Sequence, residues 1–90
     1  MELQDIVNND KLTLAMFNLY ERWLDEHEYE DINDYAKVIK GVADKEGITL
    51  HNVSGTKRPF GIKFNFNGNQ YHFYVKREGK YMRLALKRKC

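Results

Sequence analysis

The hydrophobic pattern of this chain changes its period at Gly47, and this change limits the fold more than any other feature. Before Gly47, apolar residues recur every three to four positions, as on one face of an α-helix. After Gly47 they alternate with polar residues, as on one side of a β-strand. We therefore expect one α+β domain over residues 1–90, with helices in residues 1–47 and an antiparallel sheet in residues 48–90.

The first half predicts two main helices. One is expected from Asp10 to about Glu28, with Asn9 or Asp10 as its N-cap. The second follows an acidic turn at residues 28–31 and ends at Gly47, because glycine suits the left-handed position after a helix. The two apolar stripes consist of Leu12, Met16, Leu19 and Trp23, and of Ile32, Tyr35, Ile39 and Val42. A short leading helix, or an extension of the first, is expected around residues 3–7.

The second half predicts an antiparallel meander of three or four strands. Residues 48–53 form a candidate first strand, and residues 54–59 are expected to form a loop. Asn67-Gly68 is a strong signal for a two-residue hairpin turn, and it pairs Ile62 with Phe73. Glu78-Gly79 is a weaker signal for the next turn, and it pairs Val75 with Met82.

Both hairpins place their apolar residues on the same side of the sheet, where the helices can cover them. The expected sheet contribution to the core is Phe60, Ile62, Phe64, Tyr71, Phe73, Val75, Met82, Leu84 and Leu86. The opposite face is then rich in cationic and aromatic side chains. Its candidate binding residues are Lys63, His72, Tyr74, Lys76, Tyr81, Arg83 and Lys87, with Lys57 and Arg58 in the preceding loop. Gly61 and Ala85 are expected to leave dips beside His72 and Tyr74, and His72 is expected at the surface.

The net charge of +2 hides an uneven distribution of charge along the chain. Residues 1–47 carry a net charge of −7, whereas residues 48–90 carry +9. Such asymmetry indicates an electrostatic partner surface. On the predicted sheet face, the charge comes from Lys63, Lys76, Arg83 and Lys87, and from His72 when it is protonated.

The leading hypothesis is a small, non-enzymatic protein that binds DNA or RNA through this basic face, with lysines and arginines at phosphates and the rings of Tyr and His against bases. The alternative is a protein-binding inhibitor or adaptor of phage type, for example of a host nuclease or defence complex. Its interface is either the basic sheet or the acidic cluster around the turn between the helices. Head-to-tail association of two copies is a further alternative, since the acidic end of one molecule complements the basic sheet of another.

A third hypothesis is metal-independent RNA cleavage, with a base, an acid and cations supplied by His72, Tyr74, Tyr81, Lys63 and Arg83. In its order of two helices followed by an antiparallel sheet, the chain is similar to the RelE-like ribonuclease toxins of toxin-antitoxin systems. The resemblance covers topology and no sequence motif.

Other classes of chemistry lack their usual motifs. The sequence has one cysteine, Cys90, and the three histidines lack the close spacing of a metal pair, so we expect no disulfide, metal site or cofactor. The longest apolar runs are too short to span a membrane, and the N-terminus is acidic rather than signal-like. We expect a cytoplasmic accessory protein of a bacterium or its phage, with no membrane partner.

Overall fold

The computed structural model describes residues 2–26 and 31–89, so Cys90 and most of the predicted acidic turn at 28–31 lie outside the described residues. Three helices precede four strands. The elements are α1 (Leu3–Val7), α2 (Asp10–Glu26), α3 (Ile32–Lys45), β1 (His51–Lys57), β2 (Phe60–Phe66), β3 (Asn69–Glu78) and β4 (Tyr81–Arg88).

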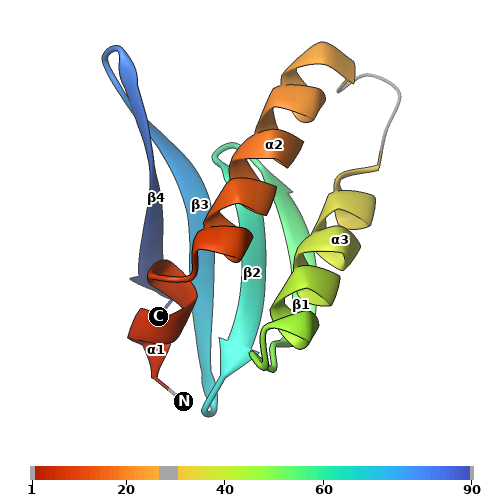
Figure 1. The fold of residues 1–90 in the computed structure, drawn as a ribbon, viewed down its shortest axis with the longest axis vertical. Helices are drawn as coiled ribbons and strands as arrows, with labels where there is room; N and C mark the ends of the chain where they lie inside the picture. Colours follow the sequence, from red (N-terminus) through yellow and green to blue (C-terminus); the bar gives the residue numbers. More distant parts are fainter. Residues whose placement is uncertain (1, 27–30, 90) are drawn as a thin grey trace.

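The fold has two layers, which confirms the expected α+β architecture (Figure 1). The four strands form an antiparallel meander in the order β1-β2-β3-β4. Helices α2 and α3 cover one face of the sheet, with α3 against β1 and α2 against β2 and β3, while the short α1 lies against β4. In the part of the chain that the structure describes, no helix is both long and apolar enough to cross a membrane.

The helix ends follow the capping signals in the sequence. The backbone amide of Leu12 donates a hydrogen bond of 2.9 Å to the Asn9 side-chain oxygen, so Asn9 caps α2. At the end of α3, Gly47 has a φ of 75°, and the amide of Ile48 donates to the carbonyl of Ala43 over 2.8 Å. This is a Schellman motif, and it confirms the predicted helix end at Gly47.

The prediction for the first strand is wrong at both ends. Ile48 and Leu50 precede the strand as buried residues, and β1 continues to Lys57 through the segment that was expected to be a loop. Gly55 explains the difference, because its backbone passes so close to α3 that a Cβ would lie 2.5 Å from the carbonyl oxygen of Ile32. Glycine here permits close helix-to-strand packing rather than a turn.

The first hairpin has the predicted register, with Ile62 opposite Phe73 and Phe64 opposite Tyr71. Asn67 and Gly68 both have positive φ, 50° and 82°, as a type I′ turn requires.

The register predicted for the second hairpin is wrong by two residues. Val75 lies opposite Leu84 rather than Met82, and Glu78 pairs with Tyr81. The turn is Gly79-Lys80, with positive φ at Gly79, because glycine at the first turn position avoids the strain that Glu78 would suffer there. Since the error is an even number of residues, every side chain keeps its predicted face.

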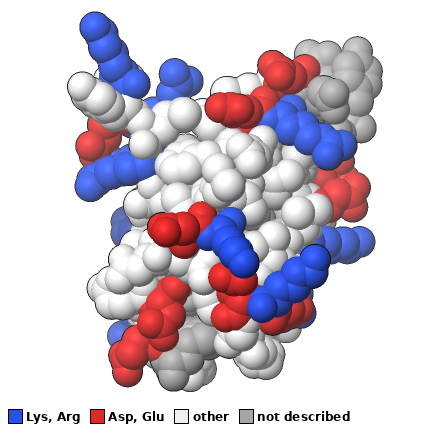
Figure 2. Space-filling view, viewed as in Figure 1, with Lys and Arg blue, Asp and Glu red and all other residues white. Residues whose placement is uncertain are grey.

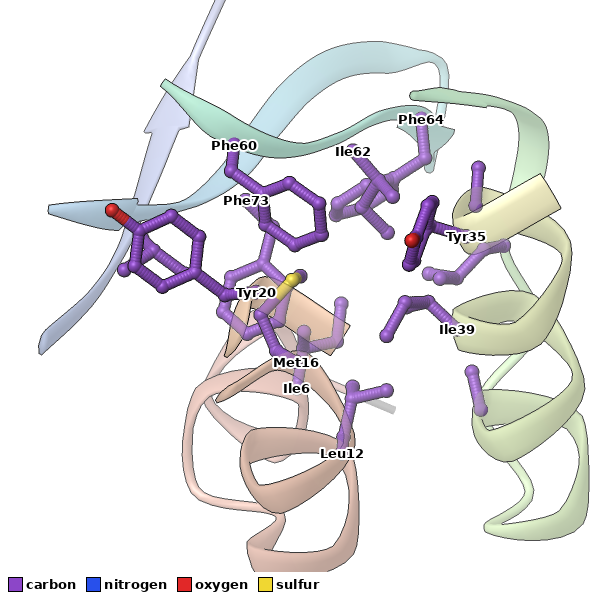
Figure 3. Packing of buried hydrophobic residues seen from close by; sticks show 14 of the residues in the cluster. Ile6, Leu12, Met16, Tyr20, Tyr35, Ile39, Phe60, Ile62, Phe64 and Phe73 are labelled. Atoms are coloured by element: carbon purple, nitrogen blue, oxygen red, sulfur yellow. The ribbon is translucent and has the colours of Figure 1, made fainter. Parts of the chain in front are cut away.

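The core lies between the two layers, where Tyr20 and Met16 of α2 face Phe60 and Phe73 of the sheet (Figure 3). Five of the nine predicted sheet residues are buried: Phe60, Ile62, Phe64, Phe73 and Val75. Tyr71, Leu84 and Leu86 are partly buried. Met82 is 41% exposed, which contradicts its prediction, because the end of the β3–β4 hairpin lies to the side of α2 and is not covered by it (Figure 1).

Candidate nucleic-acid interface

The seven candidate residues predicted on the sheet share the face opposite the helices, called the outer face below. Register and strand alternation place them there. They are Lys63 on β2, His72, Tyr74 and Lys76 on β3, and Tyr81, Arg83 and Lys87 on β4. Because the helices pack on the other side of the sheet (Figure 1), no described helix covers this face.

A row of three residues crosses the middle of the outer face. His72 of β3 lies between Lys63 of β2 and Lys87 of β4. The amide of Lys89 donates to the carbonyl of Gln70 over 2.8 Å, so antiparallel pairing continues past β4 and adds Lys89 to the same face. Sequence reasoning left Lys89 out because a basic C-terminal run is often a solvated tail.

His72 is buried, with 8% of its surface exposed, although it was expected at the surface. Its Nε2 lies 2.8 Å from the hydroxyl oxygen of Thr56, which belongs to the part of β1 that was predicted to be a loop. The Thr56 hydroxyl donates its single hydrogen to the carbonyl of Pro59 over 2.8 Å. His72 therefore carries its proton on Nε2 and donates it to Thr56, which leaves Nδ1 as an acceptor.

Burial, and to a smaller extent the charges of Lys89 and Lys63, lower the pKa of His72 from 6.5 to about 4. The imidazole is consequently neutral at neutral pH, so His72 does not contribute the positive charge that the sequence suggested. The outer face instead combines a neutral ring on β3 with Lys63 of β2 on one side and Lys87 and Lys89, on and just after β4, on the other.

The ring of His72 lies against that of Tyr74, with centroids 4.6 Å apart and planes 32° apart. A hollow of about 450 Å³ lies beside His72 and Tyr74, as predicted, and its lining also includes Pro59, Lys87, Arg88 and Lys89. It does not lie at Gly61, which is buried and where a Cβ would lie 2.5 Å from Cα of Tyr74. Gly61 instead allows β3 to approach closely, beneath the Thr56–His72 hydrogen bond. Tyr74 is half-buried, so it remains in part accessible from the solvent.

The end of the outer face near the β3–β4 turn is partly neutralised, since one carboxylate there faces two cations. One carboxylate oxygen of Glu78 lies 3.2 Å from the ammonium of Lys76 and 2.8 Å from the guanidinium of Arg83. The hydrogen bond from Lys76 and the charges of both cations hold the pKa of Glu78 below its usual value. Lys76 and Arg83 are therefore less available to an anion than their position suggests.

Lys63, Lys87 and Lys89 differ from that pair. Within residues 2–26 and 31–89, none of their ammonium groups lies within ion-pair distance of a carboxylate. The uncompensated positive charge of the outer face is thus concentrated around His72 and Tyr74.

Lys57 and Arg58 lie apart from these seven residues. They line a groove on the helix side of the sheet, together with Trp23 and Arg77. The structure thus divides the nine candidate residues between two surfaces. The alternation of side chains along β1 is the sequence signal that separates the two groups, because it places Lys57 opposite Phe60 on the helix-facing side.

The residues considered for RNA cleavage do not converge. Tyr81 pairs with Glu78, six positions along β3 from His72, which corresponds to about 20 Å. Arg83 is bound to Glu78, and the His72 Nε2 proton is held by Thr56. The described residues also contain no group of three His, Cys, Asp or Glu side chains that could hold a metal ion.

Comparisons with protein-family models, with curated proteins and with solved structures find no match to this chain.

Proposed function

We propose that the protein binds single-stranded nucleic acid through the outer face of its sheet. The observation that supports this proposal is the concentration of Lys63, Lys87 and Lys89, which lack carboxylate partners among the described residues, around the ring pair of His72 and Tyr74. Ammonium groups beside an aromatic platform are what a phosphodiester chain with unstacked bases requires.

The roles of these side chains follow from their positions. The three lysines neutralise phosphates and release counterions, which supplies most of the affinity and makes it dependent on salt. Tyr74 offers a partly exposed ring for a base, while His72 supports that ring from its other side. Tyr81, which is 79% exposed near the hairpin turn, offers a second ring farther along the face.

The shape of the face favours a single strand over a duplex. The outer face is a sheet with no projecting helix, and a helix or a two-stranded ribbon is what enters the major groove of double-stranded DNA. Sheets with accessible rings instead bind bases that are splayed apart. We infer a non-enzymatic role in which the protein covers or carries the strand.

The test is a fluorescence-anisotropy titration with labelled oligonucleotides of about 12 nucleotides, single-stranded DNA and RNA and a matched duplex, at about 50 mM and about 200 mM salt. We expect a single strand to bind, with affinity that decreases at the higher salt concentration. Absence of binding at the lower salt concentration, or a preference for the duplex, contradicts the proposal. A Tyr74→Leu variant tests the stacking role, since it retains the charge of the face but should weaken binding by about tenfold.

A further inference from the structure

The groove on the helix side is a second surface with properties of its own. It has a volume of about 490 Å³ and lies between α2 and the start of β2. Trp23 and Leu24 form one wall, and Phe60 and Val75 form the floor. Leu24 is 51% exposed, so an apolar side chain is presented to the solvent beside this apolar floor. Figure 2, which shows this side of the molecule, has an uncharged area between α2 and the β3–β4 hairpin.

The rim of the groove is cationic. Lys57 ends β1, Arg58 follows it in the turn, and Arg77 lies on the helix-facing side of β3, two residues beyond Val75. All three side chains are exposed, and none pairs with a carboxylate among residues 2–26 and 31–89. An apolar floor with an uncompensated cationic rim complements a ligand that is apolar at its centre and acidic at its edges.

The exposed apolar surface continues from the groove onto the hairpin. Met82 lies opposite Arg77 on β4 and is 41% exposed. Thus Leu24 and Met82, two of the large exposed apolar residues of the described chain, lie at the same end of the molecule as the groove. Tryptophan, methionine and arginine are enriched at protein interfaces, where partly buried aromatic residues provide most of the binding energy.

The packing of the rings favours a peptide over a nucleotide as the occupant. Trp23 contacts Phe60 with centroids 6.1 Å apart and meets Tyr35 edge-on at 5.7 Å. Tyr20 contacts Phe60 at 5.4 Å. Trp23 and Tyr20 are only 9% and 8% exposed, so neither presents an open ring face on which a base could stack. The groove can instead accept an aliphatic or aromatic side chain.

We propose that this groove binds an acidic segment of a partner protein, with one large apolar side chain against Phe60 and Val75 and carboxylates at Arg58 and Arg77. Because the groove and the outer face lie on opposite sides of the sheet, the proposal is independent of nucleic-acid binding. Together the two sites would make the protein an adaptor, able to hold a strand and a protein at once.

The experiment selects binders from a library of random peptides of about 12 residues displayed on phage, and then titrates the enriched peptides in synthetic form. Trp23 is the only tryptophan of the chain and lies in the groove wall, so its fluorescence reports occupancy when the peptides lack tryptophan. We expect the enriched peptides to combine several Asp or Glu residues with a large apolar residue. A failure to enrich any peptide, or enrichment of basic peptides, overturns the proposal.

Two pairs of charge reversals locate the binding. The double variant Arg58→Glu, Arg77→Glu should weaken peptide binding by at least about tenfold. The control Lys37→Glu, Lys45→Glu makes the same change of charge on exposed positions of α3 and should leave binding unchanged. Leu24→Ser should also weaken peptide binding. Because Leu24 is 51% exposed, this variant should remain folded, which thermal unfolding checks.

Three results would contradict the proposal at this stage. The first is equal binding to both double variants, and the second is binding that Leu24→Ser does not affect. The third is self-association of the wild-type protein in sedimentation that Arg58→Glu, Arg77→Glu abolishes, since the occupant would then be a second copy. None of these measurements uses the outer face, so failure here is distinct from failure of nucleic-acid binding.

Discussion

Thr56 of β1 and His72 of β3 are joined by a hydrogen bond of 2.8 Å that passes over the intervening strand at Gly61. This contact determines the tautomer of the imidazole and connects an edge strand to the centre of the outer face. It also explains why a histidine flanked by lysines is buried, because the proton on its Nε2 has a fixed acceptor.

Removing that acceptor should destabilise the fold. Thr56→Val leaves the buried Nε2–H of His72 without a partner, and we expect the free energy of unfolding to decrease by about 1 to 3 kcal/mol. Thr56→Ser keeps the hydroxyl and serves as the control. Urea denaturation measures both, and equal stability of the two variants would show that the hydroxyl has no such role.

The low pKa of His72 predicts a dependence of stability on pH. The folded protein protonates His72 near pH 4 and the unfolded chain near pH 6.5, so the unfolded state binds more protons between these values. The resulting stabilisation is fully present above pH 6.5 and is lost as the pH falls toward 4, by about 3 kcal/mol.

Comparison with His72→Gln isolates this contribution. Both proteins have the same carboxyl groups, so the contribution of these groups to the free energy of unfolding cancels when the two urea titrations are subtracted. We expect the advantage of the wild-type protein to shrink as the pH decreases. Parallel curves for the two proteins from pH 7 to pH 4 would mean that His72 titrates normally.

Replacing glycine with alanine should change stability in opposite directions at two positions. In Gly61→Ala the new Cβ meets the carbonyl oxygen of Phe73 and Cα of Tyr74, both backbone atoms that cannot yield independently, so stability should decrease by at least about 2 kcal/mol. In Gly41→Ala, on the exposed side of α3, the Cβ meets nothing within 4 Å, and stability should increase by up to about 1 kcal/mol. Thermal unfolding of both variants measures this contrast, and a similar shift in both would refute the close approach at Gly61.

Nucleic-acid binding should raise the pKa of His72. Phosphates at Lys63 and Lys89 would offset the two positive charges that lower this pKa. The imidazole is already buried, so a bound strand would add little further desolvation to lower the pKa again. NMR titration of the imidazole with and without a single strand measures the shift. Lys63→Gln, Lys89→Gln is the control, since it should raise the pKa without nucleic acid and abolish most of the further shift. An unchanged pKa in the saturated complex would place the strand elsewhere.

The sequence predicted the faces of the sheet better than the ends of its strands. Asn67-Gly68 determined the register of the first hairpin, because both residues tolerate positive φ. For the second hairpin, the alternation of apolar and polar residues could not distinguish a turn at residues 78–79 from one at 79–80. Both registers bury the same side of each strand.

Features that depend on contacts distant in the sequence could not be predicted. Gly55 suggested a loop, whereas its role is close contact with Ile32 of α3. The burial of His72 depends on Thr56, sixteen residues earlier, and its low pKa depends on that burial. The cationic groove likewise requires α2, the β1–β2 turn and β3 to meet, which no local pattern indicates.

The central claim is that Lys63, Lys87 and Lys89 contact phosphates, and the dependence of affinity on salt tests it most directly. Replacing all three with Gln should reduce the slope of log K against log salt concentration by about 2, the value for three lost contacts with a single strand. Replacing Lys37, Lys40 and Lys45 of α3 with Gln removes the same charge from the helix layer and should leave the slope unchanged. Equal slopes for the two triple variants would contradict the account.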